Sequence, residues 1–211
     1  MKNEDAINFW RKMAVNNPDE KTIKVNACND YTQIDADFIM RYANKDSKIL
    51  DLASGTGLTI NKYCDKVKYI EGIELIKEFS SFIKKTSNIK VVNTDIKEYH
   101  TNKKFDIITM FGIVQYFNEQ EIISIYRKYY EYIKNDGLLI IKTQFGIYDD
   151  ITVSGYSIEL KTDYYSHYRK LNKEMEILQN VGYKNIDFFD IYPPECNRWE
   201  NTHFYAIVAN K

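Results

Sequence analysis

The chain of 211 residues contains 44% hydrophobic and 28% charged residues, which is typical of a soluble globular protein with one well-packed core. Its 29 basic and 30 acidic residues give a formal net charge of −1, so no overall basic surface favours a nucleic-acid or anionic-membrane partner. No apolar run approaches the roughly 20 residues that span a bilayer.

The cysteines and the N-terminal segment indicate the compartment. The segment MKNEDAINFW is polar and lacks the apolar core of a signal peptide. Cys28, Cys64 and Cys196 are odd in number, widely spaced and without a CxxC motif. This pattern favours neither a disulfide framework nor a zinc site, so we expect no metal and a reducing, cytoplasmic location.

Residues 1–44 read as helix, loop and helix, and they precede the strand-like segments. We expect them to form a helical lid over the carboxyl ends of the strands, where ligands bind in open α/β sheets. Residues 45–211 then form the remainder of a single domain.

Short runs rich in Ile, Val and Leu alternate with helical segments after residue 45. Near-continuous apolar strands indicate burial on both faces, as in a parallel sheet covered by helices on both sides. The predicted strands are 48–53, 68–75, 89–95, 104–112 and 137–145, and the predicted helices between them are 57–66, 76–86 and 119–134.

The C-terminal part departs from this alternation. After a predicted helix over 169–181, two strand-like segments, 184–192 and 202–210, follow with no helix between them, which indicates an antiparallel pair. We therefore predict a doubly wound α/β fold whose seven-stranded sheet is mostly parallel, with the last strand antiparallel.

The first predicted strand ends in an acid and a glycine turn, KILDLASGTGLTI. Asp51 precedes Gly55 and Gly57, and such a turn lets a backbone approach a ligand closely. A phosphate-binding GxxxxGK[ST] motif is absent, and Ile60 replaces the third glycine of a dinucleotide fingerprint. These departures argue against a ligand that is bound through phosphate groups, such as a nucleoside triphosphate or a dinucleotide.

Acids also end the next two predicted strands, at Glu74 and Asp95. A carboxylate at Glu74 can accept hydrogen bonds from both hydroxyls of a ribose. Asp95 can accept from the amino group of adenine, with Leu75 and Ile96 against the ring, or it can cap the turn that follows. S-adenosylmethionine, which has a ribose and no phosphate, fits this series of acids.

The segments ILDLASGTG, IEGIEL, NTDIKEY and FDIITMFGIVQYF together resemble class I S-adenosylmethionine-dependent methyltransferases, over about residues 45–145. The closing strand pair matches the reversed seventh strand of that family. The resemblance implies that S-adenosylmethionine is bound, and S-adenosylhomocysteine released, by residues near the strand ends. These are Tyr31, Asp51, Ala53, Ser54, Gly55, Gly57, Glu74, Leu75, Asp95, Ile96, Phe111 and Gly112.

Candidates for the acceptor side follow the fourth and fifth strands. Gln115 and Tyr116 occupy positions where relatives often carry a polar or aromatic residue near the transferring methyl, and His167 lies in an insertion-like segment. We predict these three as catalytic candidates, whereas His100 is expected to face solvent. The predicted substrate-binding residues are Arg169, Arg198 and His203.

The predicted function is methyl transfer to a small polar, anionic or nucleotide-activated metabolite, at oxygen, such as a surface polysaccharide or phosphoramidate precursor. We expect a monomer or homodimer without a nucleic-acid or membrane partner. The alternatives are an RNA or protein methyltransferase, another enzyme on the same scaffold such as an aminopropyl transferase, and a non-catalytic partner subunit.

Overall fold

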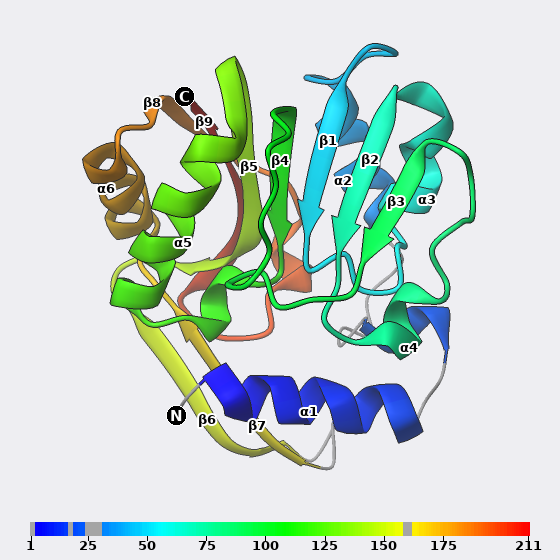
Figure 1. Ribbon diagram of the computed structural model, residues 1–211. Helices are drawn as coiled ribbons and strands as arrows, with labels where there is room; N and C mark the ends of the chain where they lie inside the picture. The colour runs from blue at the N-terminus through cyan, green and yellow to red at the C-terminus, as the bar shows by residue number, and fades with distance from the viewer. Residues whose placement is uncertain (1–2, 17–18, 24–30, 158–161) are drawn as a thin grey trace.

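A computed structural model describes residues 3–16, 19–23, 31–157 and 162–211 (Figure 1). Seven strands form one sheet in the order β3-β2-β1-β4-β5-β9-β8. Strand β9 runs antiparallel to both of its neighbours, and the pairs among β1 to β5 are parallel. The predicted fold class and the antiparallel closing pair are therefore confirmed. The strands are β1 (Lys48–Leu52), β2 (Tyr69–Ile73), β3 (Ile89–Val92), β4 (Phe105–Phe111), β5 (Ile133–Gly146), β8 (Lys184–Asp190) and β9 (Thr202–Asn210).

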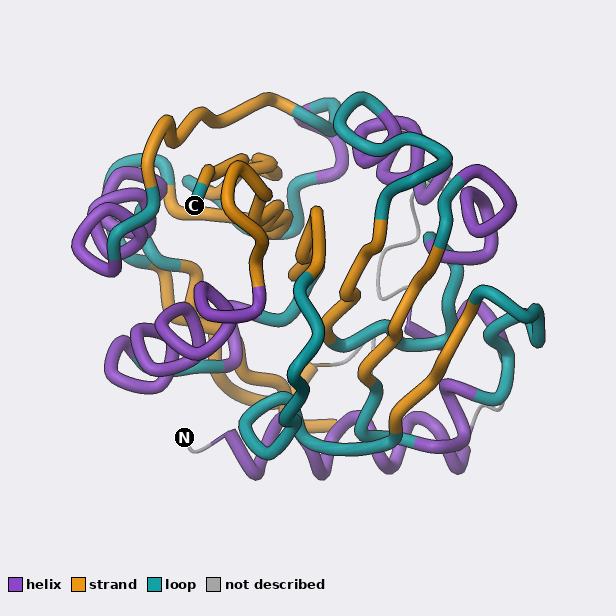
Figure 2. The backbone as a smooth tube through the Cα atoms, turned by 45° about the horizontal axis from the view of Figure 1, so that its top comes forward, coloured by secondary structure: helices purple, strands orange, loops and turns teal. Residues whose placement is uncertain are grey.

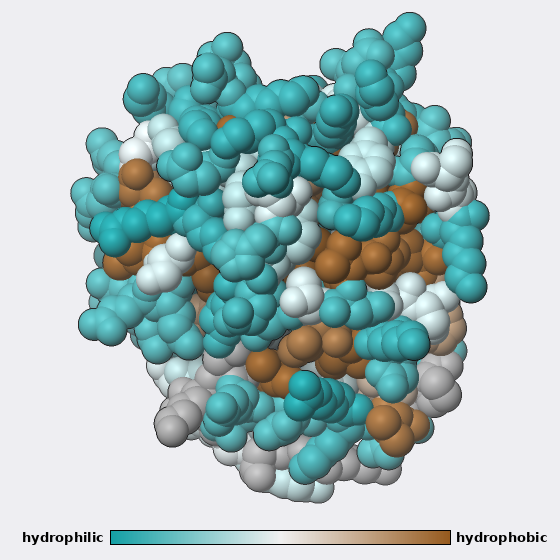
Figure 3. All heavy atoms as spheres, viewed as in Figure 1, coloured by the Kyte–Doolittle hydropathy of each residue, from teal (hydrophilic) through white to brown (hydrophobic). Residues whose placement is uncertain are grey.

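Helices cover both faces of the sheet, as Figure 2 shows. Helices α5 (Glu119–Tyr132) and α6 (Leu171–Val181) pack over one apolar cluster, while α2 (Thr32–Met40) and α3 (Ile60–Tyr63) pack over the other. The face drawn in Figure 3 is mostly hydrophilic, with apolar residues in bands between polar ones. In the described ranges, every helix is too short or too polar to cross a membrane.

Helix α5 shows how local sequence sets an element. Asn118 accepts a hydrogen bond from the backbone of Glu121, whose side chain accepts in return from the backbone of Asn118, which is a complete capping box. The apolar face of this helix is buried, since Ile122, Tyr126 and Tyr129 are all 0% exposed. Capping and burial therefore agree on one helix.

Two other predicted helices are shorter than expected. Over 57–66 the chain forms only α3 and the 3-10 turn η2 (Cys64–Lys66), and over 76–86 it forms only α4 (Lys77–Ser80). Beyond α4 the chain turns so that Ile83 packs against Gly57, where a β-carbon would lie 2.6 Å from Ile83 Cγ1. The helix therefore ends before the segment that makes this tertiary contact.

Strands β6 (Ile151–Ser157) and β7 (Thr162–Tyr168) form a separate antiparallel hairpin that the sequence analysis did not predict. The hairpin extends below the main sheet, beside α1 (Asn3–Asn16), in Figure 1. Phe9 of α1 meets Tyr164 of β7 edge to face, with ring centroids 5.9 Å apart. The hairpin and α1 thus build one wall together.

Helix α1 lies across the carboxyl ends of the parallel strands, where a lid is expected (Figure 1). Its Ala14 is buried with Ile76 and Phe79, and Trp10 packs against the same cluster. Helix α2 instead buries Phe38 in the layer on the sheet face. Short 3-10 turns are η1 (Glu20–Ile23), η3 (Val114–Tyr116) and η4 (Pro194–Cys196).

Two of the three cysteines belong to the described part of the chain. Cys64 and Cys196 are buried free thiols. Cys28 lies outside the described residues.

Candidate active site

A cavity of about 340 Å³ opens where the parallel strands end. Its walls come from the turns after β1, β2 and β4, from the end of β5, and from α1, α2 and the hairpin strand β7. Binding cavities of open α/β sheets occupy this edge, because the loops that leave the strands converge there. The fold therefore provides one site assembled from segments far apart in the sequence.

The turn after β1 forms the floor of the cavity. Ala53 and Gly55 both adopt left-handed backbone conformations, with φ of 59° and 56°. For alanine this conformation is sparsely populated, and such strain gathers at ligand sites. The Ser54 backbone N–H donates to the Ile73 carbonyl at 3.0 Å, which ties the turn to β2.

Glu74, directly after β2, faces this turn with a side chain that is nearly buried. Its Oε2 accepts from the Gly55 backbone and its Oε1 from the Ile76 backbone, each at 2.8 Å. Burial raises the pKa of Glu74 to about 7, against the lowering effect of these hydrogen bonds. Each oxygen keeps a lone pair, so the carboxylate can accept from two further donors in the cavity.

Asp51, at the end of β1, is the second buried acid in the wall. The Thr109 hydroxyl donates to its Oδ1. Burial raises the pKa of Asp51 to about 6, although hydrogen bonds from Thr109 and Ser54 favour its ionised form. Two buried acids beside the glycine turn would repel a phosphate, so the chemistry of this wall suits a neutral diol and a cation.

The other predicted donor-site residues separate into two groups. Gly57 and Asp95 do not line the cavity: Gly57 has φ 76° and packs against Ile83, and the Asp95 carboxylate accepts from the Lys97 backbone at 2.8 Å. The capping alternative for Asp95 is thus the geometry observed. The predicted residues that do line the cavity with Asp51 and Glu74 are Tyr31, Ala53, Ser54, Gly55, Leu75, Ile96, Phe111 and Gly112.

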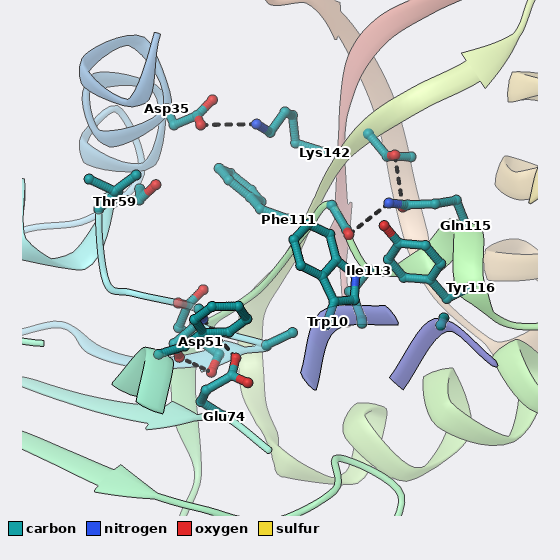
Figure 4. A pocket seen from close by; sticks show the side chains of 18 of the residues that line it. Trp10, Asp35, Asp51, Thr59, Glu74, Phe111, Ile113, Gln115, Tyr116 and Lys142 are labelled. Atoms are coloured by element: carbon teal, nitrogen blue, oxygen red, sulfur yellow. Dashed lines mark hydrogen bonds and ion pairs between the residues drawn. The ribbon is translucent and has the colours of Figure 1, made fainter. Parts of the chain in front are cut away.

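Gln115 and Tyr116, predicted as catalytic candidates, both line the opposite side of the cavity (Figure 4). Gln115 donates to the Gly112 carbonyl at 2.7 Å and accepts from the Thr143 hydroxyl at 3.0 Å, so it ties the end of β4 to β5. Burial raises the pKa of Tyr116 to about 12, and its ring meets Trp10 edge to face at 6.5 Å. Tyr116 is therefore a hydrogen-bond donor at neutral pH.

His167 and His203 are not brought to the cavity lining. His167 Nδ1 lies 2.8 Å from the Thr152 hydroxyl and its Nε2 lies 3.6 Å from Asp150, and burial lowers its pKa. His203 Nε2 lies 2.7 Å from Asp190. Both rings connect neighbouring strands, and His100 is exposed as predicted.

Arg169 and Arg198, predicted to bind substrate, differ in position. The Arg169 guanidinium is buried outside the cavity lining, where it donates to the Phe117 carbonyl at 2.7 Å and the Val114 carbonyl at 3.0 Å and pairs with Glu174. It therefore holds η3, which carries Gln115 and Tyr116. Arg198 lines the cavity, with its guanidinium 5.6 Å from the ring centroid of Tyr164.

Several cavity residues were missed in the sequence analysis. Tyr164 and Tyr168 come from the unpredicted hairpin, and Trp10 comes from α1. Lys142 carried a detectable signal, because it interrupts the apolar run GLLIIKTQF. A cation inside a buried strand needs a partner, and that partner is Asp35 of α2, with Nζ 2.9 Å from Oδ2.

A family model described as a methyltransferase domain matches residues 49–137. No curated protein matches the sequence. The structure resembles a 1,6-didemethyltoxoflavin-N1-methyltransferase from Burkholderia thailandensis, solved with S-adenosylhomocysteine, with TM-score 0.77, 12% identity, and coverage of 100% of this chain and 91% of that chain.

Two further solved structures are similar. The DhpI complex with S-adenosylhomocysteine has TM-score 0.75 and 12% identity, covering 99% of this chain and 96% of that chain. A Clostridium acetobutylicum S-adenosylmethionine-dependent methyltransferase has TM-score 0.63 and 17% identity, covering 90% and 95%. These likenesses show the fold, and the family model covers the segment that holds the glycine turn, Glu74 and Gln115. The match of residues 49–137 to a methyltransferase-domain model, together with a fold shared with class I methyltransferases, confirms the resemblance and the enzyme class predicted from the sequence.

Proposed function

We propose that the protein is an S-adenosylmethionine-dependent methyltransferase acting on a small, polar, anionic acceptor. The observation that carries the proposal is the Glu74 carboxylate, which faces the cavity, is fixed by Gly55 and Ile76, and retains lone pairs for a ribose diol. The similar structures that hold S-adenosylhomocysteine support this donor.

The donor's groups have matching partners along the wall. Glu74 binds the ribose hydroxyls, and Leu75 with Ile96 contacts the adenine ring. Ala53 and Phe111 line the methionyl part, whose ammonium is attracted by the buried Asp51. When bound, the donor supplies a methyl group activated by its sulfonium. The chain's own residues then position that methyl group and exclude water from it.

The remaining walls favour an acceptor with polar, hydrogen-bonding groups. The Tyr164 hydroxyl accepts from Ser166 at 2.7 Å and lies 3.2 Å from the Tyr168 hydroxyl, which places two phenols on one wall. Arg198 adds a cation beside them. Phenol donors and a guanidinium together suit a small anionic group.

The cavity also bears on the atom that is methylated. None of the described residues that line it is a histidine, and the phenol of Tyr116 stays protonated at neutral pH. The acids that line it, Asp35, Asp51 and Glu74, lie on the wall that we assign to the donor. An acceptor hydroxyl needs a base, whereas an oxygen that is already ionised needs none. We therefore propose transfer to an ionised oxygen, as in a carboxylate or phosphate-type group of a polysaccharide or phosphoramidate precursor. A cytoplasmic monomer or homodimer remains the accompanying prediction.

Calorimetry with S-adenosylhomocysteine tests the proposed donor, and NAD serves as the matched comparison because it shares the adenosine group. We expect binding of S-adenosylhomocysteine and none of NAD. Consumption of S-adenosylmethionine should then be screened against small carboxylates and phosphate esters. Binding of NAD with none of S-adenosylhomocysteine would contradict the proposal, and binding without transfer to any protein, RNA or small acceptor would favour a non-catalytic subunit.

A further inference from the structure

Lys142 is a cation held in the cavity wall, away from Asp51 and Glu74 (Figure 4). It lies on β5 opposite Phe111 of β4 in the parallel register, and it is 9% exposed. Its Nζ lies 2.9 Å from Asp35 Oδ2 and 3.0 Å from the Tyr192 hydroxyl, which in turn donates to Asp35 Oδ1 at 2.7 Å. The three side chains form a closed hydrogen-bonded cluster.

The cluster fixes Lys142 and leaves it able to bind a ligand. An ammonium has three N–H groups, and the contacts with Asp35 and Tyr192 use two of them. The rings of Phe111, Tyr192 and Phe204 surround the Nζ, with centroids 5.1, 4.7 and 5.9 Å away. One N–H therefore remains for a partner in the cavity, in surroundings that screen charge poorly.

The charged groups follow one another along the wall. Asp51 contributes to the raised pKa of Glu74, and Asp35 contributes to that of Asp51, so each acid acts on the next. Figure 4 shows Asp51 between Glu74 on one side and the Asp35–Lys142 pair on the other. Glu74, Asp51 and Lys142 therefore follow one another in the same order as the groups of S-adenosylmethionine, which are the ribose, the sulfonium with the ammonium, and the carboxylate.

We propose that Lys142 binds the α-carboxylate of the donor's methionyl group, with Asp35 and Tyr192 as positioning residues that hold its ammonium in place. This inference rests on the proposed S-adenosylmethionine donor. A donor whose ribose lies on Glu74 extends its methionyl group past Asp51, where the acids attract its ammonium and its carboxylate requires a cation. Lys142 is a buried cation at that end of the wall.

Two ligands separate this role from a general effect on the site. S-adenosylhomocysteine carries the carboxylate, and 5′-methylthioadenosine keeps the adenosine and sulfur but lacks the amino-acid group. We expect Lys142→Met to lower the affinity for S-adenosylhomocysteine about 10- to 100-fold, which is the range for losing a hydrogen bond to a charged group. Calorimetry measures this affinity. Affinity for 5′-methylthioadenosine should change less than about twofold, since that ligand does not reach Lys142.

A second variant guards against misfolding, because Lys142→Met leaves Asp35 buried without its cation. The double variant Lys142→Met/Asp35→Asn removes both charges and should show the same selective loss. Lys173→Met, which removes an exposed lysine, is the matched control and should leave both affinities unchanged. Selective loss of S-adenosylhomocysteine in the double variant supports the proposal.

Three results would overturn it in distinguishable ways. Unchanged affinity for S-adenosylhomocysteine would show that Lys142 does not meet the carboxylate and faces the acceptor instead. Equal loss of both ligands would assign Lys142 a structural role. Failure of the wild-type protein to bind either ligand would remove the proposed donor itself, and the Lys142 assignment with it.

Discussion

The two halves of the cavity are built differently. The half that we propose binds the donor follows from contiguous segments, in which a strand ends and an acid or a glycine turn follows. The half that we propose binds the acceptor is assembled from α1, η3, the β6–β7 hairpin and the segment before β9, which lie far apart in the sequence. Short-range patterns therefore predict the first half, and tertiary packing determines the second.

Arg169 gives the sharpest test of how the acceptor half is held together. We expect Arg169→Met to lower the free energy of unfolding by about 3–5 kcal/mol, because it leaves the Glu174 carboxylate buried without its cation. Urea denaturation measures the effect. Lys173→Met, which breaks pairs that are part exposed, should cost at most about 1 kcal/mol. Equal costs for the two variants would contradict a stabilising role for the buried pair of Arg169 and Glu174.

Glu74 gives the corresponding test of the donor half. Glu74→Ala should make the free energy of S-adenosylhomocysteine binding less favourable by about 1.5–3 kcal/mol, the cost of losing hydrogen bonds to a charged group. Isothermal calorimetry measures this directly. Glu98→Ala, an exposed acid in the loop before β4, is the control and should bind as wild type does. An unchanged affinity in Glu74→Ala would remove the ribose assignment.

Gln115 tests whether the two halves of the cavity act independently. We expect Gln115→Ala to cost about 1 kcal/mol of stability, since it removes one hydrogen bond to Gly112 and one to Thr143. Its affinity for S-adenosylhomocysteine should stay within about threefold of wild type, because the side chain lies on the acceptor side. Thermal unfolding and calorimetry on the same samples check both. A large loss of donor affinity would show that the halves are coupled.

The smallest expected effect is the pH dependence of donor binding. Burial raises the pKa of Asp51 to about 6 and of Glu74 to about 7, so both carboxyl groups are partly protonated in the unliganded site near neutral pH. The hydroxyl and ammonium groups of the ligand favour the ionised carboxylates, and binding therefore releases protons. Affinity for S-adenosylhomocysteine should therefore rise several-fold between about pH 5.5 and pH 8, with proton release on binding. Calorimetry in buffers of different ionisation enthalpy measures that release, and Glu74→Gln should reduce it.

The same two acids affect the unliganded fold in the opposite direction. Their pKa values in the folded protein lie above the ordinary 3.8 of Asp and 4.5 of Glu. At a pH between the ordinary and the raised values, the folded state therefore binds more protons than the unfolded state. Their contribution to stability is full at low pH and is lost as pH rises through about 6 to 7. A contribution that grew with pH over this window would contradict the burial of the two acids.

What the sequence could and could not predict follows from the same contrast. The strand ends, Glu74 and the turn at Gly55 were predictable because each depends on a few adjacent residues. The wall made by Tyr164 and Tyr168 was not, since nothing local to the hairpin shows that α1 packs against it. Asp95 and Gly57 match the family motif by residue type, but neither lines the cavity. Asp95 accepts a hydrogen bond from the backbone of the turn that follows it, and Gly57 packs against Ile83.

A crystal structure with S-adenosylhomocysteine tests the central claim most directly. We predict that both ribose hydroxyls donate to the Glu74 carboxylate at about 2.6–3.0 Å while the adenosine lies against Leu75 and Ile96. A ribose bound elsewhere, with Glu74 left to its backbone partners at Gly55 and Ile76, would contradict the account.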